Sequence, residues 1–265
     1  MSDRDAYVVR PRREASWSLV RDKETAASGH GFCRPDGRWF ISIDTWDDAA
    51  YEILLTAMAD DLRHDLHTVV NEADPAEVDR WRRLGFEIAR REIELTVPVD
   101  PGVTRLADAR PPRDVVLVAA DVVDEIQLRE LDDALRQDVP GSNGWRNDPV
   151  EFGEYTFDER RFDPRTYLVA VDDARREFAG LVRVWAKPSH PLLGLIAVTR
   201  HYRRRGLASA LLGAVFRTLH ERGVTHVAAT VDATNLGCIA LLGRIGATRS
   251  GATVEMIRTA APSPR

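Results

Sequence analysis

The residues with the most distinctive chemistry lie in a short basic turn between a strand-like run and a helix. The apolar run 192–198 is followed by Arg200, three more arginines and then Gly206, where a helix is expected to begin. A helix N-terminus offers unpaired N–H groups and the positive end of the helix dipole, and both favour phosphate. The arginines add charge and bidentate donors, and the glycine allows close approach of the backbone. This spacing predicts a diphosphate site.

The elements around this turn indicate a mixed α/β fold. Strands are expected at residues 114–121, 167–173, 177–185, 192–198 and 225–232, and helices at about 122–138 and 206–222. The apolar strand runs and the helical spacing of apolar residues support this assignment. The polar segment 140–164 is too long for an ordinary connection, and loops of that length are commonly functional. We therefore expect it to border an acceptor pocket.

Two segments share one pattern, which predicts tandem related domains. In the first, a strand leads to Asn71 and a short helix stops at Gly85; in the second, the corresponding residues are Asn235 and Gly246. A glycine at that place suits the left-handed residue that follows a helix. A Pro/Gly break at 98–102 separates the halves. The expected domains are residues 1–100 and 101–265.

The composition limits the class of protein. Of the 265 residues, 44% are hydrophobic, which is enough for packed cores and excludes global disorder. Two cysteines exclude a disulfide framework, and we expect no metal site. The net charge of −5 disfavours nucleic acid as a partner. No apolar stretch approaches a membrane helix, and the charged N-terminus does not resemble a secretory signal. A cytoplasmic protein without a membrane partner is expected.

The basic turn also carries the motif of a known family. Arg203-x-x-Gly206-x-Ala208, preceded by Val198 and Tyr202, resembles the acyl-CoA signature of the GCN5-related N-acetyltransferase (GNAT) family. The strand before the motif, the helix after it and the later strand and helix match the family's context. The resemblance implies a tandem GNAT fold with a mixed sheet. A truncated N-terminal GNAT-like domain, arranged as in mycothiol synthase, would precede a complete C-terminal GNAT domain.

The resemblance implies that the second half binds acetyl-CoA as its cosubstrate. Strand 192–198 would splay from strand 225–232, the pantetheine would lie between them, and a backbone N–H would polarise the thioester carbonyl. The residues that the resemblance assigns to cofactor binding are Ile196, Ala197, Val198, Arg203, Arg204, Arg205, Gly206, Leu207, Ala208, Ser209 and Asn235.

The sequence departs from the family in its proton-transfer residues. Leu242 replaces the tyrosine that protonates the leaving thiolate in many members, and strand 192–198 lacks the glutamate that often serves as base. His190 is one candidate base, because imidazole titrates near neutral pH, although it also suits a plain surface turn. Asp232 is the other candidate, and its alternative role is to cap the following turn or helix.

The acceptor is expected at the long polar loop. Trp145 and Glu151 are the candidate substrate contacts there, with core packing and simple solvation as their alternatives. Tyr155 and Tyr167 are candidates to replace the missing acid, although core packing also explains them. The acidic side chains of the loop favour a cationic amine.

The first half lacks the basic turn. Asp44, Asp47 and Asp48 stand where the second half has arginines and glycine. Because these carboxylates would repel a diphosphate, we expect no acetyl-CoA there. The first half is expected to wall the acceptor site or to stabilise the second half.

These observations favour an N-acetyltransferase that moves an acetyl group directly from acetyl-CoA to the amine of a small molecule, such as an antibiotic or another metabolite. Direct transfer fits because neither cysteine occupies a nucleophile position. The alternatives are a catalytically silent acyl-CoA-binding or scaffold protein, and an acetyltransferase like mycothiol synthase. Leu242 and the short first half argue against the latter. A monomer or homodimer is expected.

Overall fold

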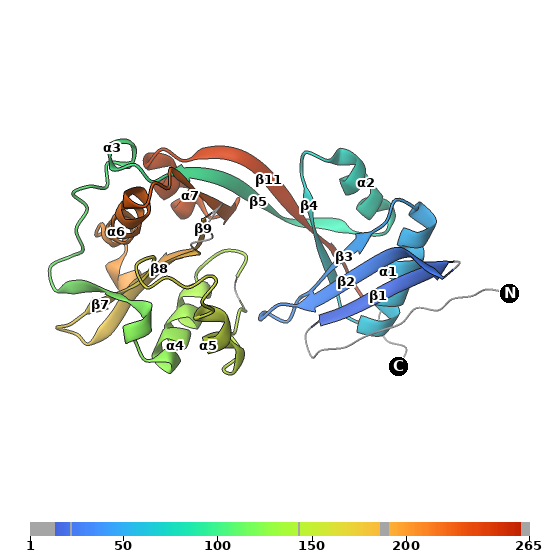
Figure 1. Cartoon of the computed structure of the whole chain (residues 1–265), viewed down its shortest axis with the longest axis horizontal. Coiled ribbons are helices and arrows are strands. Elements are labelled where there is room, and N and C mark those ends of the chain that lie inside the picture. The colour runs from blue at the N-terminus through green and yellow to red at the C-terminus, as the bar shows by residue number, and fades with distance from the viewer. Residues whose placement is uncertain (1–13, 22, 143, 186–190, 261–265) are drawn as a thin grey trace. The chain divides into compact units, whose positions relative to one another are not determined.

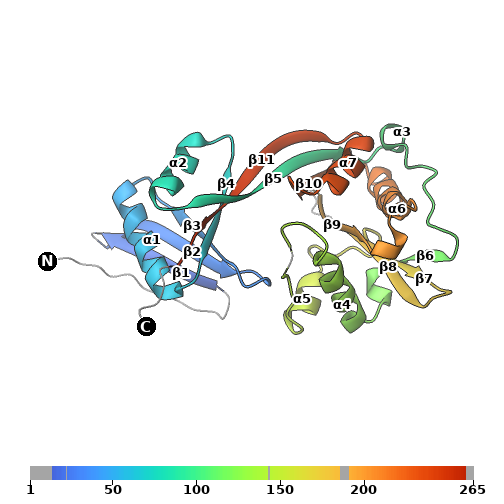
Figure 2. The same cartoon turned by 180° about the vertical axis from the view of Figure 1, so that it is seen from behind.

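The computed structural model describes residues 14–21, 23–142, 144–185 and 191–260. The chain forms two compact units, shown from opposite sides in Figures 1 and 2. The first unit combines residues 1–91 with 252–265, and the second is residues 92–251. No helix in the described part of the chain is long and apolar enough to cross a membrane.

The first unit is a sheet with two helices. Its elements are β1 (Glu14–Arg21), β2 (Glu24–Cys33), β3 (Trp39–Asp44), α1 (Asp48–Leu62), β4 (Leu66–Asn71), α2 (Pro75–Arg83) and part of β11 (Thr248–Arg258). The strand order is β1-β2-β3-β4-β11. Trp17 of β1, Leu54 and Met58 of α1 and Trp81 of α2 meet in its core. Helix α1 lies against the sheet (Figures 1 and 2), and its apolar side chains belong to the core cluster shared with β1 and α2.

The second unit holds the predicted diphosphate turn. Its elements are part of β5 (Glu87–Pro98), α3 (Pro101–Thr104), β6 (Val115–Ala119), α4 (Glu125–Arg136), α5 (Glu151–Thr156), β7 (Tyr167–Asp172), β8 (Glu177–Trp185), β9 (Leu192–Val198), α6 (Leu207–Glu221), β10 (His226–Asp232) and α7 (Leu236–Arg244). The strand order is β5-β10-β9-β8-β7-β6. Helix α6 packs in one core cluster, and α4 and α5 pack in another. The short helix α5 lies within the segment expected as a loop.

Two strands cross from one unit to the other along the chain. Strand β5 begins in the first unit but pairs antiparallel with β10 of the second, from Glu92 to Pro98. Strand β11 follows the last helix of the second unit but pairs antiparallel with β4 of the first, from Thr253 to Arg258. Each unit thus completes its sheet with a strand that the predicted boundary assigned to the other half. The contiguous division at residue 100 is corrected accordingly.

The buried side chains of β5 and β11 also belong to the unit in which each strand is paired. Leu95 and Val97 of β5 belong to the core of the second unit. Val254 and Met256 of β11 belong to the core of the first. The alternation of apolar and polar residues gives each strand a buried face, and the pairing of β5 with β10 and of β11 with β4 decides which core receives that face.

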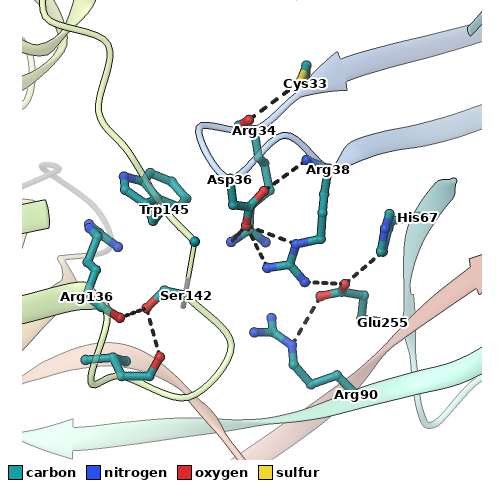
Figure 3. A network of polar contacts seen from close by, with 12 residues as sticks. Cys33, Arg34, Asp36, Arg38, His67, Arg90, Arg136, Ser142, Trp145 and Glu255 are labelled. Atoms are coloured by element: carbon teal, nitrogen blue, oxygen red, sulfur yellow. Dashed lines mark hydrogen bonds and ion pairs between the residues drawn. The ribbon is translucent and has the colours of Figure 1, made fainter. Parts of the chain in front are cut away.

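A buried carboxylate also ties β11 to the first unit. Glu255, only 2% exposed, accepts hydrogen bonds from His67 of β4 at 2.9 Å and from Arg38 at 2.8 Å, and pairs with Arg90 at 3.1 Å (Figure 3). Burial alone would raise the pKa of Glu255, but the hydrogen bond from His67 and the two arginines outweigh it and hold the pKa below its ordinary value. The charged form of Glu255 is therefore matched within this unit.

Candidate functional site

The second unit contains a wedge between two diverging parallel strands. Strands β9 and β10 are paired at Leu192 with Ala228 and at Leu193 with Ala229, and in the described chain this is their only ladder. The rest of β9 remains paired with β8 on its other side. Its backbone groups on the β10 side are therefore available to a ligand. A cavity of about 660 Å³ lies along this part of β9.

The cavity brings together most of the predicted cofactor residues. The predicted residues that line it are Ile196, Ala197, Val198, Arg203, Arg204, Gly206, Ala208, Ser209 and Asn235. Two others do not line it among the described residues. Leu207 is buried in the core, and the guanidinium of Arg205 lies over the ring of Tyr202 at 5.7 Å.

The turn before α6 is shaped by two residues in the left-handed region. Gly206 has φ 81° and Arg204 has φ 62°. Gly206 precedes α6, and no side chain caps its first N–H groups. Apart from Gly206 and the chain next to it, no described atom lies within 4 Å of where a Cβ on Gly206 would stand. The helix therefore presents free donors to open space, which is the arrangement that binds a phosphate.

Arg203 is fixed at the entrance of the wedge. Its Nε donates to the carbonyl oxygen of Val198 at 3.0 Å, and its Nη2 donates to Asp138 at 2.9 Å. Asp138 also accepts two hydrogen bonds from Arg200, each at 3.2 Å. Both arginines, Arg200 most of all, lower the pKa of this carboxyl. Asp138 lines the cavity but was missed in the sequence, since it is 65 residues from Arg203 and carries no local signal.

Helix α7 forms part of the cavity wall. Asn235 caps it by accepting from the N–H of Cys238 at 3.1 Å, so its side-chain oxygen is engaged within the chain. Cys238 and Leu241 face the cavity. Leu242, at the place of the family's tyrosine, is fully buried in the core. Its side chain supplies no proton donor at the wedge.

The structure shifts the register of the internal repeat by three residues. Strand β4 ends at Asn71 and β10 ends at Asp232, while Asp74 and Asn235 are the caps of α2 and α7. The side chains agree with this alignment. Asn71 accepts from the N–H of Ala73 at 2.9 Å, and Asp232 accepts from the N–H of Thr234 at 2.8 Å. Asn71 therefore corresponds to Asp232, rather than to Asn235 as expected from the sequence.

This alignment indicates a structural role for Asp232. Its Oδ1 also accepts from the hydroxyl of Thr234 at 2.5 Å, and it is not among the described residues that line the cavity. The neutral amide of Asn71 makes the same backbone contact in the first unit, so the turn needs an acceptor and no charge. We predict that Asp232→Asn keeps the acyl-transfer rate within about twofold, whereas Asp232→Ala loses about 1 kcal/mol of stability with the hydrogen bonds of the turn. Steady-state rates and denaturant unfolding measure both. A large rate loss in Asp232→Asn, recovered in Asp232→Glu, would restore Asp232 as the base.

The other predicted residues lie apart from the cavity or outside the described structure. Trp145 donates from Nε1 to Asn147 at 2.9 Å. The guanidinium carbon of Arg136 lies over the Trp145 ring, 4.4 Å from its centroid. Glu151 is exposed at the start of α5. Neither lines the cavity among the described residues. His190 lies outside the described residues.

The first unit has a corresponding pair of strands without the long turn. Strands β3 and β4 pair at Trp39 with Leu66 and at Phe40 with His67. Only residues 45–47 join β3 to α1, whereas residues 199–206 join β9 to α6. The N-terminus of α1 is already capped by a carboxylate, since Asp47 accepts from the N–H of Ala49 at 2.9 Å. A diphosphate would meet that negative charge.

The diverging strands β9 and β10 and the uncapped N-terminus of α6 are the arrangement expected from the motif at Arg203. The sequence agrees, because residues 128–247 match the model of the Acetyltransferase (GNAT) family. This GNAT match lies within the second unit and agrees with the resemblance carried by the motif at Arg203. No curated protein matched the chain.

Solved structures share the fold over nearly the whole chain. A GCN5-related N-acetyltransferase from Sphaerobacter thermophilus is 17% identical with a TM-score of 0.70, covering 96% of this chain and 82% of that one. A tandem GNAT protein from the clavulanic acid biosynthesis pathway is 17% identical with a TM-score of 0.68, covering 96% and 86%. A GCN5-related N-acetyltransferase from Kribbella flavida is 16% identical with a TM-score of 0.57, covering 96% and 90%. The tandem GNAT fold expected from the sequence is confirmed.

Proposed function

We propose that the chain is an acetyl-CoA-dependent N-acetyltransferase that acetylates the amine of a small molecule by direct transfer. The observation that carries the proposal is the cavity beside β9. It joins unpaired strand backbone, an uncapped helix N-terminus and Arg203 in one place. Those three features suit the pantetheine and the diphosphate of one elongated molecule.

Different residues of the wedge would bind different parts of acetyl-CoA. The backbone of Ile196 to Val198 would pair with the pantetheine amides and place an N–H on the thioester carbonyl, where charge develops during attack. The N–H groups at the start of α6, with Arg203 and Arg204, would hold the diphosphate. The thioester carbon is then presented to an amine from the acceptor side. The amine must arrive neutral, because an ammonium has no lone pair for the attack.

Cys238 is poorly suited to carry the acetyl group as an intermediate. Burial raises the pKa of its thiol to about 11, so very little thiolate exists at neutral pH. We predict that Cys238→Ala keeps kcat within about twofold, and that intact-protein mass spectrometry of the wild type with acetyl-CoA finds no acetylated enzyme. A stable acetyl adduct that disappears in Cys238→Ala would contradict direct transfer.

The proton acceptor remains a prediction from the sequence. His190 stays our candidate, because Asp232 serves the turn after β10. The leaving thiolate takes its proton from water or from a group of the acceptor, since Leu242 offers none. A pH profile of kcat/KM for wild type and His190→Gln separates these roles: if His190 is the base, the rate of the wild type falls at low pH as His190 is protonated, and the variant flattens this acidic limb.

The proposal is tested by incubating the protein and acetyl-CoA with a broad panel of primary amines. Released thiol and acetylated amine are measured together. Equal amounts of both, absent without protein, support the proposal. Acetyl-CoA that binds without transfer to any amine would instead favour a silent acyl-CoA-binding protein, the alternative suggested by the buried aliphatic residue at position 242.

A further inference from the structure

The phosphate end of the wedge contains an acidic side chain of the protein itself. Asp138 lies two residues beyond the end of α4 and is one of the residues that line the cavity. It is held by Arg200 through Nε and Nη2, both at 3.2 Å, and by Arg203 through Nη2 at 2.9 Å. A carboxylate therefore occupies the donors that a phosphate would use.

The two arginines depend on Asp138 to different degrees. The side chain of Arg200 is 81% exposed, and among the described residues its side-chain hydrogen bonds go to Asp138. Arg203 also donates from Nε to the carbonyl oxygen of Val198 at 3.0 Å, so the end of β9 keeps it in place independently. Loss of the carboxylate would leave Arg203 at the wedge with its Nη2 donor open.

We propose that Asp138 is a built-in counter-ion of the diphosphate site, which occupies Arg203 in the empty protein, is displaced by the diphosphate of acetyl-CoA, and so sets the affinity for the cosubstrate. The inference rests on the proposed function. Its physical basis is exchange: the diphosphate gains charge-assisted hydrogen bonds only by breaking those of Asp138, and the displaced carboxylate stays nearby as a like charge. Both effects reduce the net gain from binding.

The test is calorimetric titration of wild type, Asp138→Asn and a control with acetyl-CoA and with S-acetylpantetheine, which lacks the diphosphate. Asparagine keeps the size of the side chain and removes its charge. Asp163→Asn is the matched control, because Asp163 also pairs with an arginine, Arg222, and is not among the described residues that line the cavity. Circular dichroism verifies that all three proteins are folded.

Asp138→Asn is expected to bind acetyl-CoA about tenfold more tightly than wild type, which corresponds to about 1.4 kcal/mol. S-acetylpantetheine should bind both proteins equally, and Asp163→Asn should match wild type with both ligands. The affinity of Asp138→Asn for acetyl-CoA should also fall more steeply with salt, because Arg200 and Arg203 no longer have the Asp138 carboxylate as a counter-ion before the ligand binds.

Equal or weaker binding of acetyl-CoA by Asp138→Asn would overturn the inference and assign Asp138 to positioning the arginines. A gain that is the same for S-acetylpantetheine would overturn it as well, since the effect would not act at the diphosphate. In both cases the acetyl-CoA site of the proposed function stands, because wild type binds acetyl-CoA, and the amine panel tests the transfer separately. If neither wild type nor Asp138→Asn binds acetyl-CoA, the proposed function and this inference fail together.

Discussion

Acetyl-CoA should stabilise the wild-type protein, and the change Gly206→Asp should remove that effect. At 100 times its dissociation constant, a ligand that binds only the folded state adds about 2.7 kcal/mol. For a domain of this size, that corresponds to a rise of roughly 5–10 °C in Tm. Gly206→Asp places a carboxylate before the uncapped N-terminus of α6, in the open space where a diphosphate is expected. The negative charge of the new carboxylate and the space that its side chain occupies then oppose binding of the diphosphate.

The same helix offers a matched control at its other end. Gly223 follows α6 with φ 79°, close to the 81° of Gly206, and no described atom lies within 4 Å of its added Cβ either. Gly223→Asp therefore introduces the same residue at a similar backbone strain, away from the wedge. Both variants should lower the Tm of the free protein, but only Gly223→Asp should keep the shift with acetyl-CoA. Equal shifts in both variants would place the ligand elsewhere.

The second large effect concerns β5 and β11, the strands that pair in the unit to which the predicted boundary did not assign them. Leu95→Ala in β5 should destabilise the second unit, and Met256→Ala in β11 should destabilise the first. Each side chain is buried in the core of the unit that its sequence position would not suggest. Truncation of a buried Leu or Met to Ala costs about 2–5 kcal/mol, through lost transfer energy and the cavity left behind.

Hydrogen exchange followed by mass spectrometry assigns each loss to a unit. Met256→Ala should accelerate exchange in β1 to β4 and spare β7 to β10, and Leu95→Ala should do the reverse. Acetyl-CoA should protect the second unit in Met256→Ala. If instead Leu95→Ala opens β1 to β4 and leaves β10 protected, then β5 belongs to the core of the first unit. The assignment of β5 to the core of the second unit would then be wrong.

The diphosphate turn could be predicted because its information is local. The helix start at Gly206, the arginines before it and the apolar strand of residues 192–198 lie within a few residues of one another. Their geometry follows from helix capping and dipole physics without any distant contact. The wedge followed from the family resemblance rather than from the residues themselves. The structure supplies its geometry, in a strand ladder that ends after Leu193.

The strand exchange could not be predicted because strand pairing is a long-range property. The alternation in β5 and β11 states that each strand has a buried face, but not which sheet buries it. The spacing within the repeat indicated the correct alignment, but matching Asn71 to Asn235 because both are asparagine obscured it. Gly85 lies 14 residues after Asn71 (85 − 71) and Gly246 lies 14 after Asp232 (246 − 232), whereas Gly246 lies only 11 after Asn235. Spacing to the glycine was the better guide.

A crystal structure of the wild-type protein with acetyl-CoA tests the central claim most directly. We predict one molecule per chain, with its diphosphate at the N–H groups of residues 207–209 and beside Arg203, and its pantetheine along residues 196–198. Asp138 should then be turned away from Arg203. Acetyl-CoA bound to the first unit, or bound to the second unit away from β9 and α6, would contradict the account.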